Sequence, residues 1–493
     1  GAGAFELGAI APLNVGGTAT INISTSGTAV MGFITGGNVT TSPITSYGNL
    51  SITATNTTAS LATATGMIKI QSALTSYAGS VTLNTTGSGA SLTYGVDATA
   101  AISGATGVSI TNNNLIGIGV NTSALGTITS ANGTVNITST TTGSGILAVN
   151  LAGLITAPQV LITATNNTAG GTGATVTGGI TISANKNGAS NTFTSVGNAL
   201  AITSTVGTSG QAGGISVTTG AITNNSNGGN VSYVTNGDIT STAAINFATA
   251  NTTNHAQTIT YDTTTGNLNS KITTGAFTFN STGATSPVNF VEKSNGSALT
   301  IGATSVSGSI LVDNTNSGTT LAANATTGTA VTVNGALSSG GLLIGSDAIV
   351  LKAIAGTAGI GINDAAATDS LTAPIGNISL TTTTSNGAGI TFSSPITATT
   401  GNVSITGTST TGATIATTGL ITANSITVSG TGTTAATVVS LGAMTINAGG
   451  GNISVTGNDS AAGATTGITQ TGAITDNANG GNISFVSNNK IAQ

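Results

Sequence analysis

Two segments of the chain, 252 residues apart, have almost the same sequence. Residues 220–239 are GAITNNSNGGNVSYVTNGDI and residues 472–491 are GAITDNANGGNISFVSNNKI, identical at thirteen of twenty positions. Most differences are conservative, such as Val231 for Ile483 and Tyr233 for Phe485. Shorter versions of this cassette recur along the chain, and self-similarity at a period of tens of residues is typical of repeat architectures. The chain is therefore expected to be a repeat protein.

The first recurring element is a Gly-Asn pair followed by a short alternating segment. Aliphatic residues at i and i+2 with Ser or Thr between them predict a strand with one buried and one hydrated face. Gly and Asn tolerate φ > 0, which we expect the corner ahead of each strand to require. Examples are GNLSIT at 48–53, GNISLT at 376–381, GNVSIT at 401–406 and GNISVT at 451–456.

A second element, a small residue or Pro followed by an aliphatic residue and Thr, often comes shortly before the first. Examples lie at 43–45, 154–156, 395–397, 420–422 and 473–475. Units of two or three strands returning roughly every 20 to 30 residues predict a parallel β-helix, an all-β solenoid whose stacked coils share one aliphatic core. At about 22 residues per coil we expect roughly 20 coils in one continuous solenoid over residues 1–493. An irregular coil or a loop insertion is expected around 251–295, where charge is concentrated.

Composition excludes several functional classes. Charged residues make up 3% of the chain, with six Lys, no Arg, and a net charge of -5, against about 25% charged residues in average soluble proteins. A phosphate-binding groove cannot be built from so few cations, so no nucleic-acid partner is expected. No apolar run reaches the roughly 18 residues of a transmembrane helix. Cysteine is absent, which suits export through an oxidising compartment. We expect an extracellular or cell-surface protein whose signal peptide has already been removed.

The tandem of G-x-I-T-x and G-N-[VIL]-S-[IVL]-T resembles the repeat region of filamentous-haemagglutinin-type exoproteins and of β-strand-repeat autotransporter passengers. Most of the chain shares this style. The resemblance implies a bacterial secreted or surface-displayed β-helix that is right-handed. The chain departs from both families, because it has no Asn-Pro-Asn signature near residue 1 and no membrane barrel at the other end.

Candidate catalytic and metal-binding residues are few. His255 is the single histidine and has no cysteine to accompany it, so neither a metal site nor a nucleophilic triad is expected there. Glu292 with Asp313, and Asp347 with Asp369, lie one expected coil apart and would resemble the paired carboxylates of glycosidases if they stacked. Stacked like charges cost free energy, so we expect no catalytic residue, no cofactor and no metal, and treat the chain as a non-enzyme.

Thr-x-Thr runs such as 138–140 and 381–384 are typical of the flat threonine arrays of ice-binding solenoids. Their spacing along the chain varies, so an ice-binding or polysaccharide-acting β-helix is kept as an alternative only. The principal hypothesis is a structural subunit of a fibre, sheath or cell-surface layer, whose partners are further copies of itself. An adhesin that binds the cell surface or glycans is the closest alternative. The last twenty residues repeat an internal cassette, and a coil of this kind should stack either on further chain or on another copy. We expect the second, with self-assembly through Phe485, Val486 and Ile491.

Overall fold

The computed structural model describes most of the chain. The described residues are 5–7, 13–25, 33–35, 43–56, 67–87, 93–115, 117–183, 197–208, 212–226, 229–247, 257–266, 270–275, 277–278, 288–294, 298–315, 329–340, 347–355, 359–364, 366–384, 387–410, 413–433, 437–448, 451–460, 466–477 and 481–493.

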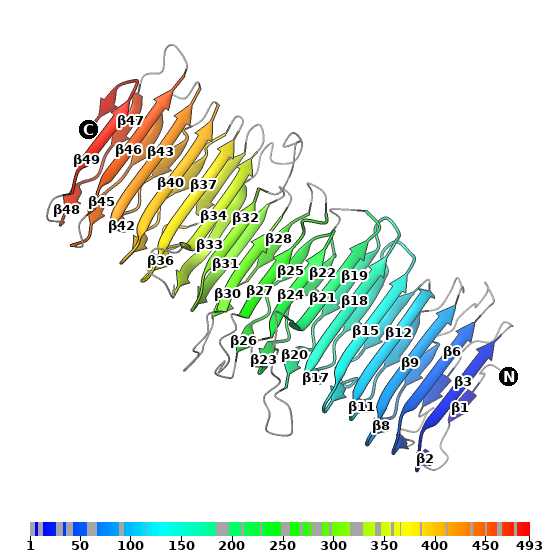
Figure 1. Ribbon diagram of the computed structural model, residues 1–493. Coiled ribbons are helices and arrows are strands. Elements are labelled where there is room, and N and C mark those ends of the chain that lie inside the picture. Colours follow the sequence, from blue (N-terminus) through cyan, green and yellow to red (C-terminus); the bar gives the residue numbers. More distant parts are fainter. Residues whose placement is uncertain are drawn as a thin grey trace. The chain divides into compact units, whose positions relative to one another are not determined.

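The described residues form an all-β parallel solenoid, in which each coil contributes one strand to each of several stacked ladders (Figure 1). This confirms the fold class predicted from the alternating segments. None of the described residues forms a helix, and accordingly no described helix is long and apolar enough to cross a membrane. The chain divides into two compact units, residues 1–255 with 280–285 and residues 256–279 with 286–493.

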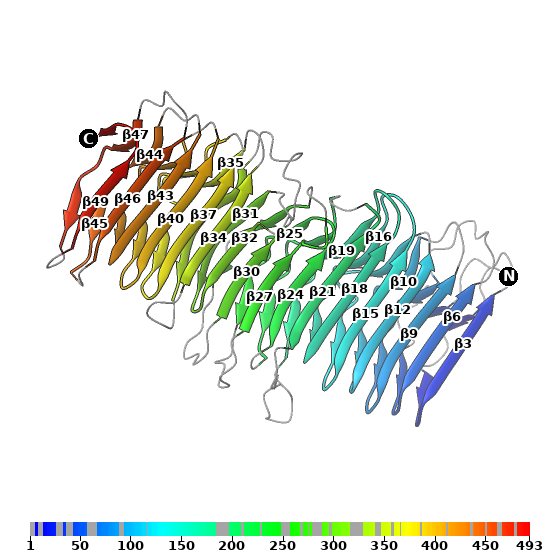
Figure 2. The ribbon, with the colours of Figure 1, turned by 45° about the horizontal axis from the view of Figure 1, so that its top comes forward.

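Three parallel ladders form the first unit, and the chain visits them in the order A, B, C in successive coils. Ladder A contains β1 (Phe5–Leu7), β4 (Phe33–Thr35), β7 (Ile68–Ile70), β10 (Tyr94–Ala98), β13 (Ile118–Thr122), β16 (Leu147–Leu151), β19 (Thr172–Val176), β22 (Ile215–Val217) and β25 (Ile239–Ser241). Ladder B contains β2 (Leu13–Val15), β5 (Ile44–Ser46), β8 (Leu74–Ser76), β11 (Ile102–Gly104), β14 (Ile128–Ser130), β17 (Ile155–Ala157), β20 (Ile180–Ile182), β23 (Ile222–Asn224) and β26 (Ile245–Phe247). Ladder C, which has the longest strands, contains β3 (Ala19–Thr25), β6 (Leu50–Asn56), β9 (Ser80–Gly87), β12 (Gly107–Leu115), β15 (Thr134–Thr141), β18 (Gln159–Asn166), β21 (Asn198–Val206) and β24 (Asn230–Thr235), which lie side by side in Figure 2.

The second unit has the same plan, with one long-strand ladder and two short-strand ladders. The long-strand ladder contains β27 (Gln257–Asp262), β30 (Val288–Lys293), β32 (Ile310–Asn314), β34 (Asp347–Ala355), β37 (Asn377–Thr384), β40 (Asn402–Ser409), β43 (Ser425–Gly432), β46 (Ile453–Asp459) and β49 (Ile483–Ser487). In a separate ladder of this unit, β28 (Ile272–Thr274) and β29 (Phe277–Thr278) pair with β31 (Leu299–Val306), and β31 pairs with β33 (Thr329–Ser339).

Strand β33 pairs with the first strands of both short-strand ladders of the second unit. Its first half pairs with β35 (Ile360–Asp364) and its second half with β36 (Leu371–Ala373). The β35 ladder continues through β38 (Ile390–Phe392), β41 (Ile415–Thr417), β44 (Thr437–Leu441), β47 (Thr466–Gln470) and β50 (Ile491–Ala492). The β36 ladder continues through β39 (Ile396–Ala398), β42 (Ile421–Ala423), β45 (Met444–Ile446) and β48 (Ile474–Asp476).

Columns of aliphatic side chains form the core of the solenoid. In β40, Val403 and Ile405 are fully buried while Ser404 between them faces outward and is partly exposed. In register, Leu380 precedes Ile405 and Val428 follows it, so each buried side chain packs between two others of its column. Each such burial stabilises the fold by about 1.5–3 kcal/mol relative to an exposed side chain.

The number of coils differs from the sequence-based expectation. Among the described strands, the long-strand ladder has eight members in the first unit and nine in the second, fewer than the roughly 20 expected from a fixed coil length. The reason is that the coil length varies. Register partners are 20 residues apart from Phe290 to Ile310 but 40 apart from Val160 to Leu200, and the extra residues lie between strands.

Glycine at the corners has a different role from the expected one. Of the four corner glycines quoted from the sequence, Gly376 has a positive φ of 97°, but Gly48, Gly401 and Gly451 do not. A Cβ on Gly401 would lie 1.8 Å from the carbonyl oxygen of Gly376 in the preceding coil. Close stacking of the corners, rather than backbone conformation, therefore requires glycine at 401.

Ile405→Asp is expected to lower the free energy of unfolding by about 3–5 kcal/mol, because it places an unpaired carboxylate inside a closed apolar column. Ser404→Asp, one residue away on the outer face, is the matched control and should change stability only slightly. Urea unfolding followed by circular dichroism measures both. Equal losses in the two variants would contradict the assignment of inward and outward faces.

Candidate interaction surfaces

The structure places the two members of each carboxylate pair singled out in the sequence at different positions. Glu292 lies beside Val312, and Asp313 lies beside Lys293, so Glu292 points into the core while Asp313 is on the outer side. Asp347 opens β34 beside Asn377. Asp369 lies in the turn before β36, where its Oδ2 accepts a 2.9 Å hydrogen bond from the Ala366 amide. Neither pair stacks. Glu292 and Asp313 are one register position apart, and a shift of one residue reverses the face of a strand. Asp347 and Asp369 do not stack because Asp369 lies outside the strands.

The remaining titratable residues do not converge either. His255 lies outside the described residues. Within the described ranges, no three His, Cys, Asp or Glu side chains come together at metal-binding distance. The prediction that the chain has no catalytic residue, cofactor or metal remains a prediction.

Glu292 is unusual because its carboxyl is completely buried. Its Oε1 accepts a 2.8 Å hydrogen bond from the Thr274 hydroxyl, while no described residue donates to Oε2. The aromatic ring of Tyr261, its neighbour in register, packs 5.6 Å from Phe290, centroid to centroid. Burial raises the pKa of Glu292 to about 8, and the Thr274 hydrogen bond only partly opposes this. The carboxyl is therefore mainly protonated at neutral pH, which removes the cost of burying a charge.

The three residues expected to drive self-assembly occupy different positions in the last coil. Phe485 extends the inward column of Val455, and Ile491 extends that of Ile468. Val486 instead follows Thr456 in an outward column. Exposed fractions are 54% for Val486 and 40% for Ile491. Phe485 and Ile491 thus belong to inward columns of the core, and Val486 belongs to the outer face.

The two copies of the cassette differ in what covers them. In the first copy, β23 pairs with both β20 and β26, and Ile222 is fully buried. In the second copy, β48 pairs with β45 alone among the described strands, and the equivalent Ile474 is partly exposed. Ile483, equivalent to the buried Val231, is 49% exposed. Nearly identical sequences thus form equivalent strands, β23 and β24 in the first copy and β48 and β49 in the second.

The outer face of β37, β40, β43 and β46 carries a two-dimensional array of hydroxyl groups, which we call the hydroxyl face. A first outward column, at the start of the strands, contains Asn377, Asn402 and Ser425 and is not part of the hydroxyl face. The other three columns have twelve positions, of which eleven are Ser or Thr and one is Asn, and none is charged. Register aligns them in three columns of four, which are Ser379, Ser404, Thr427 and Ser454; Thr381, Thr406, Ser429 and Thr456; and Thr383, Thr408, Thr431 and Asn458.

The hydroxyl face corrects an inference made from sequence spacing. From Thr381 to Thr406 to Ser429 the chain advances 25 and then 23 residues, yet the three side chains lie in register. The variation is absorbed between the strands, so irregular spacing along the chain does not prevent a regular array.

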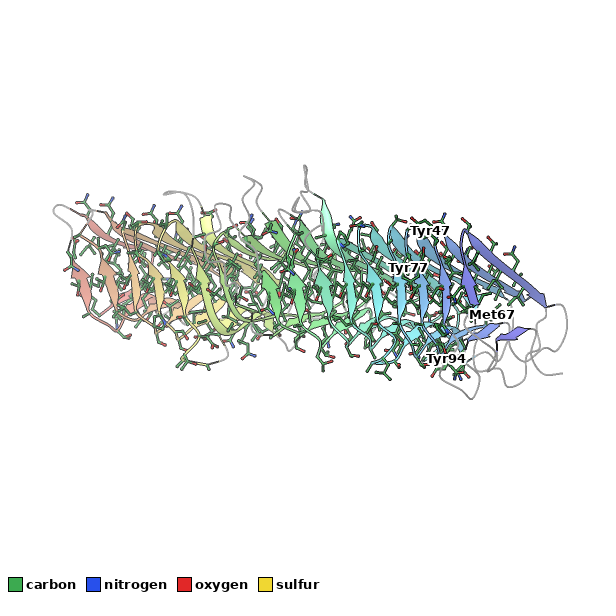
Figure 3. All side chains as sticks on the ribbon, turned by 90° about the horizontal axis from the view of Figure 1, so that it is seen from below. Tyr47, Met67, Tyr77 and Tyr94 are labelled. Carbon is green, nitrogen blue, oxygen red and sulfur yellow. The ribbon has the colours of Figure 1, made fainter. Side chains whose placement is uncertain are left out.

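Two tyrosines form an exposed aromatic pair that the sequence analysis missed. Tyr47 and Tyr77 are 64% and 66% exposed and follow β5 and β8 on consecutive coils of the first unit. The Ala78 amide donates to the Tyr47 carbonyl at 2.8 Å, which fixes the two corners against each other. Figure 3 shows both side chains along one edge, with Tyr94 at the opposite edge in that view. The signal was available as the repeated tetrapeptides ITSY at 44–47 and LTSY at 74–77.

Comparison with known proteins gives no relative. No family model, no curated protein and no solved structure matches this chain. The architecture of the described residues is that of β-helix repeat proteins.

Glu292→Gln is expected to reduce the loss of stability with rising pH. The native carboxyl keeps its proton up to about pH 8, whereas the unfolded carboxyl ionises near 4.5. Between these values the unfolded state binds fewer protons, so the free energy of unfolding falls as pH rises, by at most about 1.4 kcal/mol per pH unit. Above the native pKa both states are ionised and the fall stops.

Urea unfolding of the wild type and of Glu292→Gln at about pH 5, 7 and 9 measures this effect, because the difference between the two proteins cancels the other titrating groups. The wild type should lose stability relative to the variant between the lowest and the highest pH. Two parallel curves would show that Glu292 does not titrate as its burial requires.

Proposed function

We propose that this chain is a non-enzymatic extracellular structural protein, a subunit of a fibre, sheath or cell-surface layer built by packing of β-solenoids. The β-solenoid fold and the resemblance of its repeats to filamentous-haemagglutinin-type and autotransporter-passenger proteins support this role. The partner of each copy is another copy of the same chain.

The observation that carries the proposal is the parallel ladder that joins successive coils of the solenoid. Strand edges of this kind can pair with a strand of another chain as well as with the next coil of their own chain. Phe485 and Ile491 continue two inward columns of the core. A coil of a second copy stacked on β49 and β50 would bury both side chains.

Low charge also favours contact between copies. The chain has six basic and eleven acidic residues in 493, so electrostatic repulsion between neighbouring solenoids is weak. The exterior therefore opposes neither end-to-end nor lateral packing.

Phe485→Lys combined with Ile491→Lys is expected to abolish end-to-end assembly, because stacking a coil on these residues would bury two unpaired ammonium groups. Val486→Lys is the matched control, since it adds charge to the same coil on the outer face. Sedimentation velocity and electron microscopy at increasing concentration measure the oligomers, and circular dichroism checks the fold. A wild type that stays monomeric at high concentration, or a double variant that assembles as the wild type does, would refute end-to-end stacking.

A surface adhesin is the second candidate function, and Tyr47 with Tyr77 favour it. Exposed tyrosine pairs supply large rigid contact area at low entropic cost, and their position on consecutive coils suits an extended ligand such as a glycan chain.

Tyr47→Ser combined with Tyr77→Ser should abolish binding to glycan arrays and to cells without changing the unfolding midpoint. Leu125→Ser is the control, because Leu125 is an apolar side chain that is also exposed but stands apart from the pair. Unchanged glycan binding by the double variant, or no binding by the wild type, would exclude the pair as a binding site.

A further inference from the structure

We propose that the hydroxyl face binds ice. This activity is separate from the structural role proposed above, and it concerns the outer side of β37, β40, β43 and β46 rather than the inward columns at β49 and β50. The ligand is a crystalline surface of water rather than a soluble molecule.

The hydroxyl face repeats regularly in two dimensions. Neighbouring coils are spaced about 4.8 Å apart, and outward residues two positions apart along a strand about 6.6 Å apart. The spacing between coils lies near the shorter repeat of oxygen positions on a prism face of hexagonal ice, and the spacing along a strand is somewhat shorter than the longer repeat. A regular array in two directions lets several coils engage one lattice plane, so weak single contacts add up as in multivalent binding.

The side-chain positions of the hydroxyl face are held rigidly. Each hydroxyl is carried by a strand that is hydrogen-bonded to both neighbouring coils or to the ladder that continues them. The β-branched Thr side chain has few χ1 rotamers. Binding to a lattice therefore costs little additional ordering of the protein, which is the usual advantage of a preorganised site.

The hydroxyl face presents hydroxyl and methyl groups and no charged group. Thr381, Thr406 and Thr408 are exposed, and each presents a methyl group beside its hydroxyl. The hydroxyl can donate to and accept from lattice water, and the methyl group fills space between lattice waters without competing hydrogen bonds. No ionised side chain in the array holds a hydration shell of its own. The nearest ones in register are at the border, where Lys352 lies beside Thr381.

A polysaccharide surface fits the hydroxyl face less well. Sites for organic ligands are concave and lined with aromatic side chains and a few convergent polar groups. The twelve outward positions include no aromatic residue and no carboxylate. Water has no apolar ring face to stack, so ice is the ligand that needs none of these groups.

The test uses the full chain, with Thr406→Lys combined with Thr408→Lys in the middle of the hydroxyl face. Thr397→Lys combined with Thr422→Lys is the matched control, because these residues lie in a single outward column of the β36 ladder, stacked in the same way but without a second dimension. Partitioning of each protein into slowly grown ice and inhibition of ice recrystallisation are measured, together with the unfolding midpoint. Thr406→Gln with Thr408→Gln, bulky but uncharged, replaces the lysine variant if that variant is unfolded.

The expected result is that the wild type and the Thr397, Thr422 variant enter the ice, while the Thr406, Thr408 variant is excluded like a non-binding protein. The Phe485, Ile491 variant should also enter the ice, which separates this proposal from end-to-end assembly. Exclusion of the wild type from ice, equal loss in both Thr-to-Lys variants, or retention of the wild type on insoluble chitin or cellulose in place of ice would overturn the proposal.

Discussion

The parallel backbone ladder between successive coils is the constraint on which the rest of this structure depends. Hydrogen bonding between coils fixes register residue by residue, and the strand period of two then decides which side chains face inward. Ile405 is buried and Thr406 is exposed for this reason alone. Segments between strands contribute little to register, so coils 20 and 40 residues long coexist in one chain without disturbing the columns.

The same ladder places polar groups inside the protein, and the structure satisfies them unequally. Asp364 accepts hydrogen bonds at its Oδ2 from the amides and hydroxyls of both Ser393 and Ser394, at 2.7–2.9 Å. These donors compensate the carboxylate for lost hydration. Glu292 receives one hydrogen bond, from Thr274, so burial acts on its pKa almost unopposed. Identical chemistry thus has different consequences according to the number of donors that the neighbouring coil supplies.

Two surfaces of this solenoid follow from the register of its ladders. Phe485 and Ile491 continue inward columns, and they support the proposed contact with a second copy. The hydroxyl face keeps its register over four coils, and it supports the proposed contact with ice. The low charge of the chain serves both, because neither contact has to displace a strongly hydrated ion.

The sequence by itself determined the fold class. Ile and Val alternating with Ser and Thr in segments such as 403–406 predict half-buried strands, and the return of such segments roughly every 20 to 30 residues predicts that they stack as parallel coils. It could not determine register, since pairing is a contact between coils and the intervening segments vary in length. The sequence could not decide whether Glu292 and Asp313 stack, and the structure places them on opposite faces. The threonine columns were expected to be irregular and are aligned. Only the tertiary structure decided which side chains meet, because a one-residue shift between coils exchanges the core for the surface.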